Sequence, residues 1–107
     1  MRQAVFDYVD GLAPELDPDL LVEETITRAA DQREALERIL DQLTDEEREQ
    51  VRAADRVLIR EAARLAPWWR AEVAEDRVEF GLPREHWWWW IDEIADGVFP
   101  RELLPEV

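Results

Sequence analysis

Apolar residues recur along most of the chain at spacings of three, four and seven, the period of a helix with one buried side. One such stripe follows Asp17-Pro18, a pair that combines an N-terminal capping residue with a proline in the first helical turn. Its members are Val22, Ile26, Ala29, Leu36, Leu40 and Leu43. Arg33 interrupts the stripe. The pattern predicts a long helix over residues 18–43.

A second helix is predicted directly after the first. Thr44 and Glu47 have the spacing of a capping box, in which each side chain accepts a hydrogen bond from the backbone N–H of the other residue. The apolar stripe that follows comprises Val51, Ala54, Leu58, Ala62 and Leu65. Because so short a connection forces the helices to run antiparallel, residues 18–66 are predicted to form an αα-hairpin. Pro67 is expected to end or kink the second helix.

Shorter helices are predicted on both sides of this hairpin. Residues 2–11 have apolar side chains at helical spacing and end in Gly11, which favours a short opening helix. After Pro67, the run PWWRAEVAEDRVEFG is predicted to form a third helix that closes near Gly81. The alternation in VEFGL (78–82) leaves a short strand as the alternative for its end.

Four consecutive tryptophans, residues 87–90, lie in the predicted last helix, which runs over 83–96 with Gly97 as its cap. Adjacent side chains on a helix diverge by about 100°, so four of them cannot face one core. The predicted core face of this helix consists of Trp87, Trp90, Ile91 and Ile94, with Trp88 at its flank. A tail that folds back on the bundle is expected after it.

Trp89 is predicted to project from an acidic face of the last helix. Its neighbours three, four and seven residues further on are Asp92, Glu93 and Asp96. The indole is covered by the tail or a neighbouring helix, by a second copy of the chain, or by a different protein. Tryptophan is enriched at the energetic centres of protein interfaces. Trp89, Trp88 and Trp68 are therefore candidates for partner binding, and one of Trp68 and its neighbour Trp69 is expected at the rim.

Arginine recurs at every fourth position of the predicted second helix, at Arg48, Arg52, Arg56, Arg60 and Arg64. Like charges at this spacing destabilise a helix by on the order of a few tenths of a kcal/mol per pair. Acids three or four residues away can offset three of them: Asp45 for Arg48, Glu49 and Asp55 for Arg52, and Glu61 for Arg64. Arg56 and Arg60 have no such neighbour, so another helix, a second subunit or an anionic ligand is expected to pair with them. They complete the set of candidate partner-binding residues.

The charge of the chain narrows the choice of partner. It has 27 acidic residues against 13 basic ones, all of them arginine, and a formal net charge of −14. This charge repels phosphate backbones and anionic lipids, so we expect neither nucleic acid nor membrane as a direct partner. It suits a basic protein partner, keeps the protein in solution, or reflects adaptation of a whole proteome. A hydrophobic content of 47% argues against disorder.

The scarcity of reactive residues argues against catalysis. There is no cysteine, which excludes disulfides and thiolate metal sites and fits a cytoplasmic location. Neither a signal peptide nor a membrane-spanning segment is expected. His86, the single histidine, is expected to cap the last helix or to pack beside Trp89 or Trp90. Without a glycine-rich phosphate loop or a Glu-x-x-His pair, we predict no cofactor and no metal site.

Pairs of carboxylates three residues apart give the chain one enzyme-like feature. Glu46 and Glu49 form one pair, and Glu72 and Glu75, followed by Asp76, form another. This loose spacing resembles the all-α magnesium-dependent nucleotide pyrophosphohydrolases, which place acids on two helices. The resemblance implies magnesium binding, since hard cations prefer clustered carboxylates.

The sequence as a whole predicts one all-α domain, residues 1–107, a small bundle of about four helices built on the 18–66 hairpin with a tryptophan-rich C-terminal helix. Its predicted function is non-catalytic interaction, either self-association into a homo-oligomer or docking on a basic protein partner. An antitoxin-like or nucleic-acid-mimic inhibitor of a DNA-binding protein is the first alternative. The magnesium-dependent pyrophosphohydrolase is the second.

Overall fold

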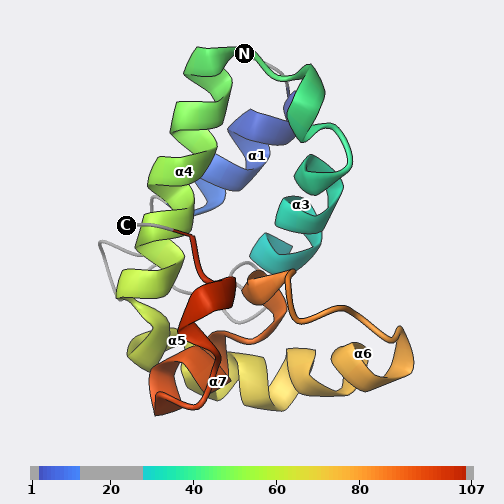
Figure 1. Cartoon of the computed structure of the whole chain (residues 1–107), viewed down its shortest axis with the longest axis vertical. Helices are drawn as coiled ribbons and strands as arrows, with labels where there is room; N and C mark the ends of the chain where they lie inside the picture. Colours follow the sequence, from blue (N-terminus) through green and yellow to red (C-terminus); the bar gives the residue numbers. More distant parts are fainter. Residues whose placement is uncertain (1–2, 13–27, 106–107) are drawn as a thin grey trace. The chain divides into compact units, whose positions relative to one another are not determined.

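The computed structural model describes residues 3–12 and 28–105 (Figure 1). Across these two ranges the regular structure is helical and no strand occurs, which confirms the predicted all-α class. The chain divides into two compact units, Met1–Val57 and Leu58–Val107, which are described in turn. None of the described helices combines the length and the apolar content needed to cross a bilayer.

The described residues of the first unit form three helices and a 3-10 turn. These are α1 (Gln3–Leu12), α3 (Arg28–Glu37), the turn η3 (Leu40–Gln42) and most of α4 (Asp45–Arg60). α1 continues past Gly11, where it was predicted to end. The predicted long helix is wrong at its C-terminal end, because α3 stops at Glu37 and η3 follows. The predicted start of that helix, with Val22 and Ile26, lies outside the described residues.

The core of the first unit follows the predicted stripes and includes α1. Ala29, Leu36 and Leu43 are buried as predicted, and so are Val51 and Ala54 of α4. α3 and α4 run in opposite directions, as the short connection required (Figure 1). α1 packs on α3 and contributes two fully buried side chains, Val5 and Tyr8. The hairpin therefore forms its core together with the opening helix.

The start of α4 is fixed by the predicted capping box. The backbone N–H of Thr44 donates to Glu47 Oε1 (3.0 Å), and the backbone N–H of Glu47 donates to Thr44 Oγ1 (3.1 Å). Arg48 reaches back from the first turn and donates to the carbonyl oxygens of Leu40 (3.0 Å) and Asp41 (2.9 Å). These bonds satisfy backbone groups that the ends of η3 and α4 leave without helical partners.

Replacing Thr44 by alanine is expected to lower the free energy of unfolding by about 1 kcal/mol, because one N–H at the start of α4 loses its acceptor. Urea denaturation followed by circular dichroism measures this change. Thr44→Ser keeps the hydroxyl oxygen and should retain most of the stability. Equal stability of Thr44→Ala and the wild type would contradict the contribution of the capping box.

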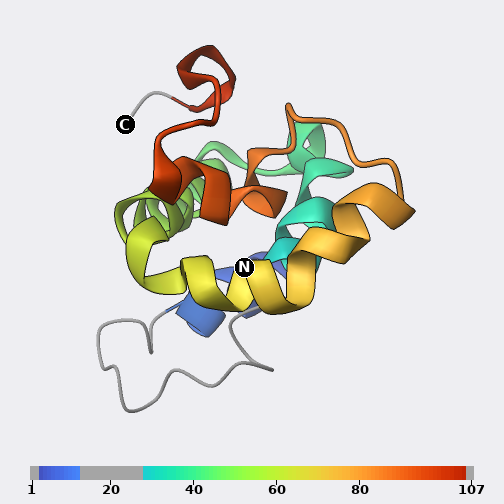
Figure 2. The ribbon, with the colours of Figure 1, turned by 90° about the horizontal axis from the view of Figure 1, so that it is seen from below.

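The second unit is built from short helical segments. After the end of α4 and a turn at Glu61 come α5 (Ala62–Trp68), the π-helix η4 (Trp69–Val73), α6 (Ala74–Glu79), the 3-10 turn η5 (Trp87–Trp89), α7 (Ile91–Asp96) and the 3-10 turn η6 (Arg101–Leu103). α5, η4 and α6 form one continuous run, drawn yellow to light orange in Figure 2. α7 packs against α5 and η4. Leu58, Ala62 and Leu65 are buried, as their spacing predicted.

Pro67 was predicted to end or kink the helix; the helix does not end there, since Pro67 lies inside α5. Its missing N–H removes one backbone bond, the one that the carbonyl of Ala63 would accept. The run then widens into η4, where the N–H of Ala74 donates to the carbonyl of Trp69, five residues earlier. Both Trp69 and Val73 remain on the buried side of this wider turn.

Glycines end the two helices on either side of the tryptophan segment. Gly81 (φ 59°) and Gly97 (φ 75°) occupy the left-handed region that favours glycine. The bonds that close these ends run from Leu82 N–H to Arg77 O (3.2 Å) and from Val98 N–H to Glu93 O (3.1 Å). Both have the six-to-one pattern of the Schellman cap. The cap at Gly97 was predicted, and helix α6 takes the place of the strand considered for 78–82.

Candidate functional site

The tryptophan segment does not form the single helix predicted over 83–96. Trp87–Trp89 form the 3-10 turn η5, Trp90 leaves helical geometry (φ −117°, ψ 34°), and α7 begins at Ile91. Because the backbone changes direction at Trp90, the four indoles are no longer fixed at steps of about 100°. All four tryptophans are buried, with 1–7% of their surface exposed. Of the alternatives considered for Trp89, cover by other parts of the same chain is therefore the one observed, and the flank position of Trp88 is wrong.

Trp88 is enclosed by other aromatic side chains of this chain. The ring of His86 stacks on it with centroids 4.8 Å apart, and Trp87 meets it edge-on at 5.6 Å. His86 thus packs beside Trp88, not beside Trp89 or Trp90 as expected. The carbonyl of Trp88 accepts a hydrogen bond from the indole N–H of Trp69 (2.9 Å). Of the pair Trp68 and Trp69, the second is fully buried and the first half-buried at the rim, as predicted.

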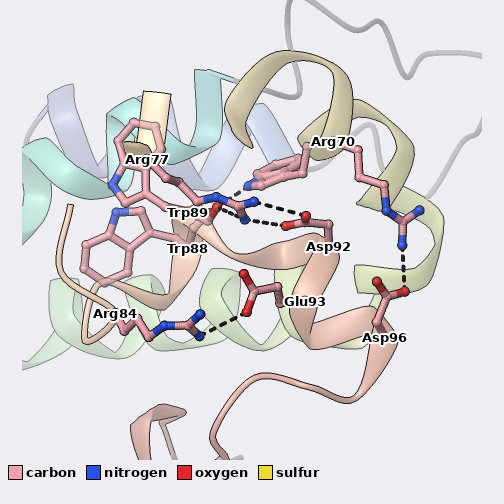
Figure 3. Close-up of polar contacts among 9 residues, drawn as sticks. Arg70, Arg77, Arg84, Trp88, Trp89, Asp92, Glu93 and Asp96 are labelled. Atoms are coloured by element: carbon pink, nitrogen blue, oxygen red, sulfur yellow. Dashed lines mark hydrogen bonds and ion pairs between the residues drawn. The ribbon is translucent and has the colours of Figure 1, made fainter. Parts of the chain in front are cut away.

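Arg77 of α6 binds both η5 and α7. Its Nη1 donates to Asp92 Oδ1 (2.6 Å) and to the carbonyl of Trp89 (3.1 Å), and its Nη2 donates to Asp92 Oδ2 (3.3 Å) (Figure 3). The guanidinium carbon also lies 5.5 Å from the centre of the Trp90 ring. This bidentate ion pair between Arg77 and Asp92 is largely shielded from water, which makes it stronger than a surface ion pair.

The other acids of α7 are paired as well. Arg84 donates to Glu93 (3.0 Å), and Arg70 of η4 donates to Asp96 (2.6 Å) (Figure 3). The guanidinium of Arg84 also lies near the rings of Trp90 and Phe99, so the buried Phe99 brings the tail back as predicted. The three acids that were predicted to surround Trp89 thus each pair with an arginine.

The arginines of the row, four on α4 and Arg64 on α5, pair with acids that are close to them in sequence. Arg56 donates to Glu49 seven residues earlier (3.3 Å), and Arg60 lies 3.7 Å from the adjacent Glu61. Arg52 and Arg64 also pair with Glu49 and Glu61. The expectation that Arg56 and Arg60 need partners from another element is therefore wrong, because a long arginine side chain reaches acids outside the three-to-four spacing.

A buried polar cluster that the sequence did not reveal as a whole lies in the first unit. Arg33, the residue that interrupts the apolar stripe, donates through Nε to Asp55 Oδ1 (2.9 Å) and also pairs with Glu37 (2.9 Å). The hydroxyl of Tyr8 donates to the same oxygen of Asp55 (2.6 Å). Asp55 was predicted to face Arg52 and is instead buried. The one signal in the sequence was Arg33, since a buried guanidinium requires a buried acceptor.

Burial determines the ionisation of this cluster. It raises the pKa of the Asp55 carboxyl, and the neighbouring Arg33 guanidinium and Tyr8 hydroxyl oppose that effect. Burial, together with the charge of Asp55, raises the pKa of the Tyr8 hydroxyl well above its usual value. Tyr8 therefore stays protonated and serves as a hydrogen-bond donor that links α1 to α4.

Some large apolar side chains of the described residues are exposed to solvent. Val78 and Phe80, at the end of α6, are exposed to 86% and 66%, and Phe6 and Val98 are further examples. Glu75 and Glu79 beside them are exposed, and neither forms an ion pair within the described ranges. The alternation in VEFGL was the sequence signal for this surface, but it was interpreted as a possible strand.

The carboxylates that resemble those of the pyrophosphohydrolases are exposed on their helices. Glu46 and Glu49 lie on α4, whereas Glu72 lies on η4 and Glu75 on α6. In residues 3–12 and 28–105 no group of three or more histidines or acids is arranged so that it could hold a metal ion.

Comparisons with models of known protein families, with curated proteins and with solved structures find no match to this chain. The function is therefore inferred from the arrangement of its own residues.

Proposed function

We propose that the protein is a non-catalytic interaction module that docks on a basic protein partner. The observation that carries this proposal is the high exposure of two large apolar side chains, Val78 in the last turn of α6 and Phe80 directly after it. Apolar side chains of this size lose contact with water when a partner covers them, and exposed apolar patches rimmed by polar residues mark interaction sites.

The charge of the molecule supports a basic partner. The formal net charge is −14, and Glu75 and Glu79 lie on either side of Val78 without an ion pair among the described residues. Opposite charges on two proteins speed their association. The negative charge of this protein also repels acidic proteins that would otherwise compete for the site. Arg77, which lies next to Val78 in the sequence, faces inward to Asp92 and does not reduce this local negative charge.

The buried ionisable groups support a structural role for the polar residues. Arg33 and Asp55 pair with each other, Asp92 pairs with Arg77, and Glu47 accepts the capping bond of Thr44. Each of these groups contributes to holding helices or turns together. A catalytic centre, by contrast, usually contains an ionisable group that is kept ready for a substrate.

Of the five residues that the sequence offered for partner binding, only Trp68 is kept in this proposal. Trp88 and Trp89 are covered by side chains of their own chain, and Arg56 and Arg60 have acidic partners. Trp68 is half-buried on the rim of α5 and remains part of the proposal. The interface is therefore proposed around α6, with Trp68 on the same helical run.

Photo-crosslinking from position 80 tests the proposal. The photoreactive residue p-benzoylphenylalanine replaces Phe80 in the full chain, and irradiation is carried out in cells that produce the protein. The expected result is one adduct whose second component, identified by mass spectrometry, is a basic protein. The same residue at position 6, in place of the exposed Phe6 of α1, is the matched control and should not give this adduct. Adducts only with a second copy, or equal labelling from both positions, would overturn the proposal.

A further inference from the structure

The run from α5 to α6 has an exposed side on which apolar and acidic residues occur together. Ala62, Leu65, Ala66, Trp69 and Val73 form its buried side. The opposite side, here called the outer face, consists of Pro67, Trp68, Ala71, Glu72, Glu75, Val78 and Glu79. All of these residues are exposed except Trp68, which is half-buried. Exposed apolar and acidic residues thus occur together along this run, whose backbone is drawn yellow to light orange in Figure 2.

The outer face is negative because the arginines of the run are held elsewhere. Arg64 pairs with Glu61, Arg70 with Asp96 and Arg77 with Asp92. Glu75 and Glu79, by contrast, form no ion pair in the part of the chain that the structure describes. The outer face therefore presents the carboxylates of Glu75 and Glu79, one helical turn apart, beside exposed apolar side chains, and no described residue forms an ion pair with either of them.

We infer that the outer face binds an amphipathic helix of a partner protein whose polar side carries arginine or lysine. Such a helix places cationic side chains at a spacing of four, which matches Glu75 and Glu79, and apolar side chains that cover Trp68, Ala71 and Val78. This inference rests on the proposed function and adds the place and the chemistry of the partner.

The charge of the outer face decides between this occupant and a second copy of the chain. In a symmetric dimer the same patch of both copies is buried, so Glu75 and Glu79 would be brought against the same acidic patch of the second copy. Like charges brought together in this way oppose association, whereas a basic helix neutralises them. The two occupants are also distinguished experimentally, since only self-association changes the mass of the protein alone.

Fluorescence anisotropy with a synthetic peptide tests the inference. The probe is a labelled amphipathic peptide of about 18 residues, the length of the run, with leucine on one side and arginine on the other. We expect the full-length protein to bind it with a Kd on the order of 1–10 μM at low salt, and more weakly as salt is added. A peptide of the same composition in scrambled order should bind at least about tenfold more weakly, because it presents no apolar stripe.

Three variants locate the binding. Val78→Ser and the double variant Glu75→Gln/Glu79→Gln should each weaken binding by about tenfold or more, the effect expected of central interface residues. Phe6→Ser removes an exposed aromatic side chain from α1 and should leave binding unchanged. All four positions are exposed, and circular dichroism verifies that each variant keeps its helical content. If Val78→Ser lowers that content, the glutamate variant provides the test.

Three outcomes would overturn the inference. One is equal binding of the amphipathic and scrambled peptides, and another is binding that neither Val78→Ser nor the glutamate variant weakens. The third is a dimer, detected by light scattering, that Val78→Ser dissociates. A basic protein crosslinked from position 80 together with failure of the peptide experiment would leave the proposed function intact and remove only the helix-binding face. Failure of the crosslinking alone would remove the proposed function.

Discussion

Replacing Trp69 by alanine is expected to lower the free energy of unfolding by about 3–5 kcal/mol, the usual cost of deleting a buried aromatic side chain. Trp69 is fully buried in the second unit, and its indole N–H donates to the carbonyl of Trp88. The variant loses the burial of the indole, leaves a cavity beside η4 and leaves the carbonyl of Trp88 without its donor. Because whole domains are stable by only about 5–15 kcal/mol, this loss is large.

Its neighbour Trp68 provides the matched control. Trp68 is half-buried on the same turn of helix, so Trp68→Ala removes an indole of equal size with a smaller loss of buried area. Urea denaturation, followed by circular dichroism, measures both variants. Trp69→Phe separates the two contributions, since it keeps most of the volume and removes the hydrogen bond. Equal destabilisation by Trp68→Ala and Trp69→Ala would contradict the assignment of Trp69 to the core.

Replacing Arg33 by methionine is expected to lower the free energy of unfolding by about 3–5 kcal/mol at neutral pH, because Asp55 is then buried without a counter-charge. Methionine fills much of the space of the arginine stem but offers no donor. Tyr8 still donates to Asp55, but one neutral hydrogen bond does not replace the guanidinium. The loss of the ion pair weakens the attachment of α3 to α4.

The loss in Arg33→Met should depend on pH in a defined direction. Burial already raises the pKa of Asp55, and removal of the guanidinium, which lowers it, raises that pKa further. The folded state then binds a proton more readily than the unfolded chain does. Stability relative to the wild type should therefore fall as pH rises from the ordinary aspartate value through the raised one, and recover as pH is lowered. Its slope in that window approaches about 1.4 kcal/mol per pH unit.

Replacing the whole cluster gives the control for Arg33→Met. The triple variant Tyr8→Phe/Arg33→Met/Asp55→Leu leaves no buried charge or unpaired hydroxyl and should regain most of the lost stability, as other buried ion pairs do when they are exchanged for apolar residues. Its difference from the wild type should lack the pH dependence of the single variant. A single variant that is as stable as the wild type at neutral pH would mean that Asp55 is not buried in solution.

Local patterns predicted the features that depend on neighbouring residues alone. The capping box of Thr44 and Glu47, the cap at Gly97, and the buried stripe from Val51 to Leu65 all agree with the structure. Each rests on backbone bonds or on side chains three to four residues apart within one helix. The all-α class follows from the same patterns.

Patterns within one helix could not predict the directions of the tryptophans. The predicted directions assumed an unbroken helix over 83–96, whereas the backbone leaves helical geometry at Trp90. Of the arginines that pair with the acids of α7, Arg70 and Arg77 lie outside that range, and Arg84 lies nine residues from its partner Glu93. A bidentate ion pair and a cation over an indole ring stabilise the broken geometry, and both depend on residues that are distant in sequence.

The same limit explains why the helix does not end at Pro67 and why the surface position predicted for Asp55 is wrong. A proline ends a helix on local grounds, but here the run continues because Trp69 and Val73 are buried on its inner side. Asp55 lies at the spacing of a surface partner for Arg52, whereas Arg33, from another helix, and Tyr8, from α1, hold it in the core.

The sequence by itself thus determined the helical class, the start of α4, the apolar stripes and the strong negative charge. The tertiary structure alone decided which tryptophans are covered, which arginines are neutralised and which apolar side chains, Val78 and Phe80, remain exposed. The physical reason is the range of the forces concerned. Helix formation and capping act over about one turn, whereas burial and ion pairing depend on residues that only folding brings together.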